Sequence, residues 1–125
     1  MAEKVCLDTD ICIAVLNGEK RVEDFRKVLT DSELFTTSIT VFELYLRDYN
    51  LDKIIGLLNN VYVLNFDEIC AIKASNIQKQ LKSKGVMLEF RDVFIASIAI
   101  INNCSLATFN KKHFSRIKNL ELLKF

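Results

Sequence analysis

The sequence predicts an α/β fold built around a mainly parallel sheet. Short apolar segments alternate along the chain with longer segments in which apolar residues recur at helical spacing. With 125 residues, 50% of them hydrophobic, the chain is long enough to bury one core. It has no proline and only three glycines, and no linker or repeat divides it. We therefore expect a single domain over residues 1–125, with right-handed helical crossovers between its strands.

Five short segments are typical of strands. The first is expected at residues 5–7, and the helical pattern that follows it ends near Gly18. The other four are expected at residues 34–37, 61–64, 105–108 and 120–123.

Helices are predicted between these strands. Residues 19–30 are charged with apolar side chains on one face, which indicates an amphipathic helix. Further helices are expected at residues 40–46, 51–58 and 67–84. The last of these is expected to stop at Gly85, because glycine readily takes the left-handed conformation that ends a helix. Residues 91–102 are apolar nearly all round, which predicts a buried helix.

The net charge excludes a strongly basic or strongly acidic protein. The chain contains seventeen lysines and arginines and sixteen aspartates and glutamates, which gives a net charge of +1. The two parts of the chain nevertheless have opposite sign: residues 1–70 contain 7 basic and 13 acidic side chains, whereas residues 71–125 contain 10 and 3. The C-terminal excess is either a patch for a polyanion such as RNA or a set of solvated helix faces.

Cysteine usage and the N-terminus indicate a reducing compartment. The four cysteines lie in apolar segments without CxxC spacing, which is typical of reduced core thiols. His113 is the only histidine, so we expect no zinc site of the cysteine and histidine type. The N-terminus has no basic region followed by a long apolar run, and no apolar stretch approaches ~18 residues. We therefore expect a cytoplasmic protein.

Three acids and an amide fall where a parallel sheet binds ligands, at the carboxyl ends of its strands. Asp8 ends the first strand, and Glu43 is expected in the first turn of the helix after the second strand. Asp92 opens the buried helix, and Asn110 follows the strand that ends at Thr108.

Each acid also has a purely structural interpretation. Asp8 is a candidate N-cap, and Thr40-x-x-Glu43 fits a capping box. Asp92 is placed to interact with the helix dipole.

Together the acids point to a metal site. Carboxylates that converge near ~4 Å repel each other by about 4 kcal/mol per pair at an effective dielectric of ~20, so something must offset the repulsion. Mg²⁺ or Mn²⁺ does so with one or two carboxylates, waters and phosphate oxygens. Such a site supports hydrolysis of a phosphodiester by an activated water.

Four stretches of the chain resemble the motifs of the PIN-domain ribonucleases, in particular the small VapC-type toxins of toxin–antitoxin pairs. They occur in the family's order and are DTDICI at residues 8–13, TSITVFEL at 37–44, RDVFIASIA at 91–99 and ATFNKKHF at 107–114. The resemblance extends from residue 5 to residue 123 and so covers nearly the whole chain.

The resemblance implies a three-layer α/β/α fold with a twisted, mainly parallel sheet of four to five strands. It also implies an Mg²⁺-dependent or Mn²⁺-dependent endoribonuclease that forms a homodimer and is inhibited by an antitoxin protein. The family's catalytic acids match Asp8, Glu43 and Asp92 as metal ligands, with Asp8 and Asp92 the most direct.

The fourth catalytic position departs from the family's common pattern, because Asn110 stands where many members have an acid. An amide can hold a metal or a water but adds no negative charge, which favours one metal ion over two. Glu89, three residues before Asp92, is either a replacement acid or a solvated residue.

Four further residues are candidates for substrate binding. Thr9 and Thr108 are placed to hydrogen-bond the acids or a water, or to serve as turn or cap residues. Lys111 and Lys112 follow Asn110 closely and are candidates for phosphate contacts, with a solvated loop as the alternative.

Two other functions are compatible with the sequence. One is a catalytically weakened PIN scaffold that binds RNA or a protein, with Asn110 as the sign of decay. The other is a phosphoacceptor receiver domain, which has similar length and βα alternation. That fold requires an acceptor aspartate at the end of the third strand, where Asp67 and Glu68 instead suit a helix start.

Overall fold

The computed structural model describes residues 2–48 and 50–125. In these residues four strands form one parallel sheet in the order β3-β2-β1-β4. They are β1 (Lys4–Leu7), β2 (Glu33–Thr37), β3 (Tyr62–Leu64) and β4 (Ser105–Ala107). The parallel sheet confirms the predicted α/β class.

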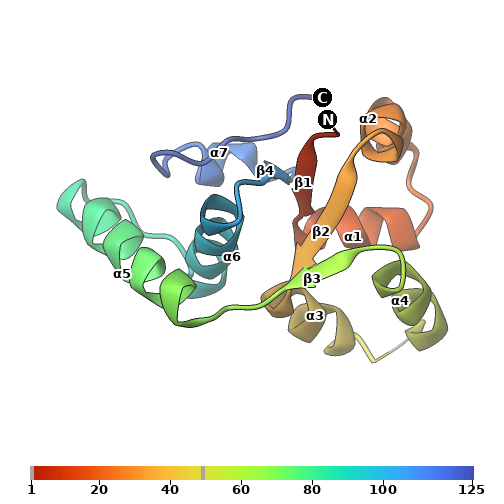
Figure 1. Cartoon of the computed structure of the whole chain (residues 1–125), viewed down its shortest axis with the longest axis horizontal. Coiled ribbons are helices and arrows are strands. Elements are labelled where there is room, and N and C mark those ends of the chain that lie inside the picture. Colours follow the sequence, from red (N-terminus) through yellow and green to blue (C-terminus); the bar gives the residue numbers. More distant parts are fainter. Residues whose placement is uncertain (1, 49) are drawn as a thin grey trace.

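Helices connect the strands and cover both faces of the sheet (Figure 1). They are α1 (Thr9–Leu16), the 3₁₀ helix η1 (Lys20–Phe25), α2 (Arg26–Thr30), α3 (Ser38–Tyr45), α4 (Leu51–Leu58), α5 (Glu68–Ser83), α6 (Phe90–Ile101) and α7 (Lys111–Phe114). The α5 helix ends as predicted, with Gly85 just beyond it at a φ of 70°.

Alternating side chains of the strands divide the core into two clusters, one on each face of the sheet. In β1, Val5 and Leu7 pack with the helices α1, η1 and α4, whereas Cys6 packs with α5, α6 and α7. Phe25 and Phe114 are fully buried, one in each cluster. The two clusters on either side of one sheet confirm the three-layer α/β/α arrangement.

Residues 19–30 do not form the single amphipathic helix that was expected. The backbone at Phe25 has φ −129° and ψ 11°, and this break separates η1 from α2. Val22 and Phe25 are three residues apart in a 3₁₀ helix, so both side chains lie on its buried face. The apolar pattern was interpreted correctly as a buried face, but its periodicity did not distinguish the two helix types.

The predicted strand at residues 120–123 is also wrong. Within the described residues this segment forms only one isolated parallel bridge, between Leu106 and Leu122. Two backbone hydrogen bonds hold it, from Leu106 N to Glu121 O and from Leu123 N to Leu106 O, each 2.8 Å.

The four cysteines are buried free thiols, as predicted. Burial raises the pKa of Cys12 to about 12, which keeps this thiol protonated and unreactive. None of the helices in residues 2–48 and 50–125 is long and apolar enough to cross a membrane.

Candidate active site

The strand order brings four elements together at one edge of the sheet. The chain leaves β1 toward β2 on one side, and β4 lies on the other side of β1. This change of direction opens a crevice at the carboxyl ends of β1 and β4, the usual place for a ligand in such a sheet. A 2.9 Å hydrogen bond from Asp8 N to Ala107 O joins the two strand ends.

Asp8 is the most enclosed acid of this edge, with 6% of its surface exposed. Its Oδ1 accepts a 2.8 Å hydrogen bond from Thr9 N, so Asp8 caps α1 as its structural interpretation predicted. Its Oδ2 accepts a 2.7 Å hydrogen bond from the Thr108 hydroxyl. The capping and metal-binding interpretations are therefore compatible, because the carboxylate also lines the pocket described below.

Asp10 is a site residue that the sequence reasoning missed. Its Oδ2 accepts hydrogen bonds from Phe109 N at 3.0 Å and from the Thr108 hydroxyl at 3.3 Å. Its Oδ1 is buried and has no hydrogen-bond partner. The available signal was its position two residues after Asp8 at the same strand end. The Thr108 hydroxyl thus lies between two carboxylates.

Glu43 comes from α3, but not from its first turn as expected. Thr37 is the N-cap of α3 and accepts a 3.0 Å hydrogen bond from Thr40 N, so the proposed capping box of Thr40 and Glu43 is wrong. Glu43 lies in the second turn, with 14% of its side chain exposed. Its Oε1 accepts a 2.7 Å hydrogen bond from the Thr9 hydroxyl, which fixes the carboxylate against α1.

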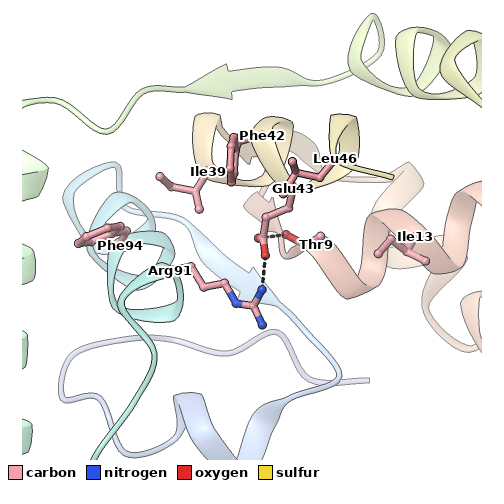
Figure 2. Close-up of a pocket in the computed structure, with 8 residues that line it drawn as sticks. All are labelled: Thr9, Ile13, Ile39, Phe42, Glu43, Leu46, Arg91 and Phe94. Atoms are coloured by element: carbon pink, nitrogen blue, oxygen red, sulfur yellow. Dashed lines mark hydrogen bonds and ion pairs between the residues drawn. The ribbon is translucent and has the colours of Figure 1, made fainter. Parts of the chain in front are cut away.

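Arg91 is the second site residue that the sequence reasoning missed, although it directly precedes Asp92. Its guanidinium lies 3.0 Å from Glu43 Oε2 and 2.8 Å from Glu89 Oε2. Figure 2 shows the side chains of Glu43 and Arg91 extending toward each other, with Thr9 on the other side of the carboxylate. Both oxygens of Glu43 are thus occupied by partners from other elements.

These side chains line a pocket of about 400 Å³. Its lining consists of Asp8, Thr9, Asp10, Ile13, Glu43, Glu89, Arg91, Asp92, Asn110 and His113. All four predicted catalytic residues are therefore brought together. The amide nitrogen of Asn110 lies 3.0 Å from His113 Nδ1, which places both side chains at the exposed rim. Glu89 belongs to the same pocket, and it is exposed.

Burial and mutual repulsion disfavour the charged form of the acids. Burial first, and then the charge of Asp10, raise the pKa of Asp8 to about 7, although hydrogen bonds from Thr108 and Thr9 oppose the shift. Burial also raises the pKa values of Asp10 and Asp92. The Arg91 guanidinium acts in the opposite direction on the pKa of Asp92. The pocket is thus poised to accept positive charge.

The lining fits a hard divalent cation, although it is not a finished metal cage. As placed, no three carboxylate, imidazole or thiol groups among the described residues converge closely enough to bind an ion together. Mg²⁺ requires only one or two carboxylates, with waters and phosphate oxygens completing its octahedron. Asp8 offers such a carboxylate together with Asp92, since the charges of both Asp92 and Asp10 act on it across the pocket.

The candidate substrate residues separate into two groups. Thr9 and Thr108 hydrogen-bond the acids as expected, and Thr108 is fully buried. Lys111 and Lys112 lie on α7 and do not line the pocket. Lys111 instead donates a 3.3 Å hydrogen bond to Phe125 O and places its ammonium over the Phe125 ring.

An apolar pocket of about 380 Å³ adjoins the acidic one. It shares Thr9, Ile13, Glu43 and Arg91 with the acidic pocket, and the remaining lining residues are Ile39, Phe42, Leu46 and Phe94. Figure 2 shows this lining, with the pair of Glu43 and Arg91 at its centre. Phe42 of this lining is 63% exposed.

Several known proteins resemble this chain in sequence. The sequence pattern of the PIN domain family matches residues 5–120. Ribonuclease VapC3 of Methanocaldococcus jannaschii is 36% identical over 92 residues, which cover 74% of this chain and 94% of that protein. The tRNA(fMet)-specific endonuclease VapC of Salmonella typhimurium is 28% identical over 126 residues, which cover 95% of this chain and 96% of that protein.

Solved structures show the same fold. The DNA-bound VapBC complex from Salmonella typhimurium contains a chain that superposes with a TM-score of 0.86 at 26% identity, covering 98% of both chains. The VapBC2 complex from Rickettsia felis, bound to a DNA fragment from its promoter, gives a TM-score of 0.85 at 26% identity and covers 96% of this chain and 97% of the other.

Proposed function

The chain belongs to the PIN domain family, and from this premise we propose that it is a metal-dependent endoribonuclease that acts as the toxin of a toxin–antitoxin pair. The observation that carries the proposal is the acidic pocket at the carboxyl ends of β1 and β4, where Asp8, Asp10, Glu43 and Asp92 meet. Relatives named as VapC ribonucleases match along almost the whole chain, which supports cleavage of RNA.

Bound Mg²⁺ or Mn²⁺ would lower the pKa of a coordinated water and neutralise charge on the phosphate. Asp8 and Asp92 are the residues proposed to hold it. Asp8 is immobilised by its two hydrogen bonds, and Asp92 lies in the first turn of α6, where the helix dipole stabilises a negative charge. Glu43 would complete the acidic set from α3 once its partner Arg91 moves away.

The remaining polar residues position these groups. Thr108 holds the carboxylates of Asp8 and Asp10, and Thr9 holds that of Glu43. Asn110 occupies the rim beside His113, where an amide can orient a water or a phosphate oxygen without adding charge. Since only neutral Asn110 occupies the fourth position, we propose a single metal ion.

The partners are proposed from the related complexes. The superposable chains come from VapBC complexes, one of them described as bound to promoter DNA, which supports a separate antitoxin for this chain. We also propose a homodimer and a cytoplasmic location.

A cleavage assay tests the proposal. The purified protein is incubated with total RNA and with a set of tRNAs, in the presence of Mg²⁺, Mn²⁺ or EDTA, and new 5′ ends are mapped. We expect discrete cuts that require the metal and disappear in Asp92→Asn. Cuts that persist in EDTA would contradict the metal dependence.

A binding module without cleavage is the second candidate. Two features favour it: Asn110 is an amide where the family resemblance implies an acid in many members, and as placed no three ligating groups among the described residues form a metal cluster. This function predicts RNA retention in a gel-shift assay with no products under any metal, so demonstrated turnover would exclude it.

A further inference from the structure

Arg91 supplies the permanent positive charge of the acidic pocket. Of the described residues that line this pocket, five are carboxylates, and Arg91 is the only lysine or arginine. Its guanidinium is divided between Glu43, which is mostly buried, and Glu89, which is 68% exposed. Arg91 is therefore already an internal counter-ion to the acids.

The Arg91 ion pair also controls the availability of Glu43. One oxygen of Glu43 accepts from Thr9, and the other accepts from the Arg91 guanidinium at 3.0 Å. The guanidinium takes up one acceptor site of Glu43 Oε2, and its positive charge repels a cation that approaches the same oxygen, so Arg91 and a cation compete for Glu43. Glu89 lies at the rim and can keep Arg91 paired when it leaves Glu43.

We propose that Arg91 is a positioning residue that sets the affinity of the site for a divalent cation by competing for Glu43. In the metal-free protein it holds Glu43 in place and offsets part of the repulsion among the acids. When a cation enters, Arg91 exchanges Glu43 for Glu89 or for a substrate phosphate. This inference rests on the proposed metal-dependent function, since it concerns the same pocket.

Binding of Mn²⁺ itself tests the inference, followed by electron paramagnetic resonance of the free ion and by calorimetry without RNA. Arg91→Met keeps an unbranched, flexible side chain about as long as the aliphatic part of arginine but removes the charge, so we expect Mn²⁺ to bind about three- to tenfold more tightly than to the wild type. Arg91→Lys keeps the charge but loses the planar fork that reaches both acids, so its affinity should lie between the two.

The matched control is Arg26→Met. Arg26 also forms an ion pair with a glutamate, Glu23, at 2.7 Å, but it does not line the pocket. This control should bind Mn²⁺ with wild-type affinity. A second test combines Arg91→Met with Glu43→Gln. The tighter binding should largely disappear in this background, because the two residues act through one contact.

Thermal unfolding gives an independent measurement. In EDTA, Arg91→Met should unfold at a lower temperature than the wild type, and Mn²⁺ should raise its melting temperature by more. Equal Mn²⁺ affinity of Arg91→Met and the wild type would overturn the role of Arg91 and leave the nuclease proposal standing. If Arg91→Met tightens Mn²⁺ binding equally in the wild-type and Glu43→Gln backgrounds, this would overturn the competition for Glu43. Failure of both proteins to bind Mn²⁺ would overturn the inference together with metal dependence.

Discussion

The Thr108 hydroxyl donates a 2.7 Å hydrogen bond to Asp8 Oδ2 although the two residues are separated by 100 positions in the sequence. Thr108 follows β4 and Asp8 follows β1, and the two strands are neighbours in the sheet. The bond fixes a buried carboxylate. The same Thr108 hydroxyl oxygen also lies 3.3 Å from Asp10 Oδ2. The bond is therefore the contact through which the strand pairing shapes the acidic pocket.

Thr108→Val should lower the free energy of unfolding by about 1–3 kcal/mol, because it leaves buried hydrogen-bonding groups without their partner. The hydroxyl also accepts a 3.0 Å hydrogen bond from Asn110 N, which the valine variant loses as well. Urea unfolding at pH 8 measures the change. Thr108→Ser keeps the hydroxyl and is the control. A valine variant as stable as the wild type would contradict this role.

The stability of the metal-free protein should fall as the pH rises from about 4 to about 7. Burial and the charge of Asp10 raise the pKa of Asp8 to about 7 in the folded chain, whereas an exposed aspartate titrates near ~3.9. The folded state therefore binds the proton more tightly, and this stabilisation is fully present below pH ~4 and lost as the pH passes ~7.

Asp8→Asn should remove the contribution of Asp8 to this pH dependence and leave the smaller contributions of Asp10 and Asp92, whose pKa values burial also raises. In EDTA at pH 8 the variant should be more stable than the wild type, by up to about 4 kcal/mol, and the difference should shrink toward pH 4. Urea unfolding at several pH values measures it. Asp31→Asn, at an exposed position, is the control and should change stability little. A variant less stable than the wild type at pH 8 would contradict the assignment.

Asp8→Asn and Asp92→Asn should each reduce RNA cleavage by at least about 100-fold while preserving the fold, because each removes a charge from the proposed metal site. Initial rates on a labelled RNA measure the effect, and circular dichroism checks the fold. Asp31→Asn again serves as the control. Undiminished rates in both variants would rule out the assigned site.

Asn110→Asp should increase the affinity for Mn²⁺ by about threefold or more, because it adds a carboxylate at the rim of an already acidic pocket. Calorimetry with Mn²⁺ gives the affinity. The metal-free variant should also be less stable than the wild type. Asn76→Asp adds the same charge on the exposed face of α5 and controls for net charge. Unchanged affinity would show that the fourth position does not contact the ion.

Sequence reasoning identified the acids through their place in the strand and helix pattern. Asp8 follows a short apolar strand, and Asp92 lies in the first turn of a helix that is apolar nearly all round, so their position at one edge of a parallel sheet could be predicted. The same reasoning misplaced the start of α3 by two residues, because Thr37 and Thr40 are both good capping residues. Only the hydrogen bond from Thr40 N to Thr37 decided between them.

Asp10 and Arg91 were missed for a different reason. Both lie within segments that were recognised, but nothing in a linear pattern shows which side chains share a partner. The common hydroxyl of Thr108 and the pairing of Arg91 with Glu43 join residues about 50 to 100 positions apart. Such contacts depend on side-chain direction, which the period of a helix or strand constrains only loosely.

The sequence alone determined the α/β class and the acids at the strand ends, because the placement of apolar residues reflects the type and burial of each element. Only the tertiary structure decided which of these groups interact. It placed Thr108 between Asp8 and Asp10 and occupied Glu43 with Arg91. The physical reason is that burial and charge repulsion arise only once distant segments pack together, so the balance of charge in this pocket is a property of the fold.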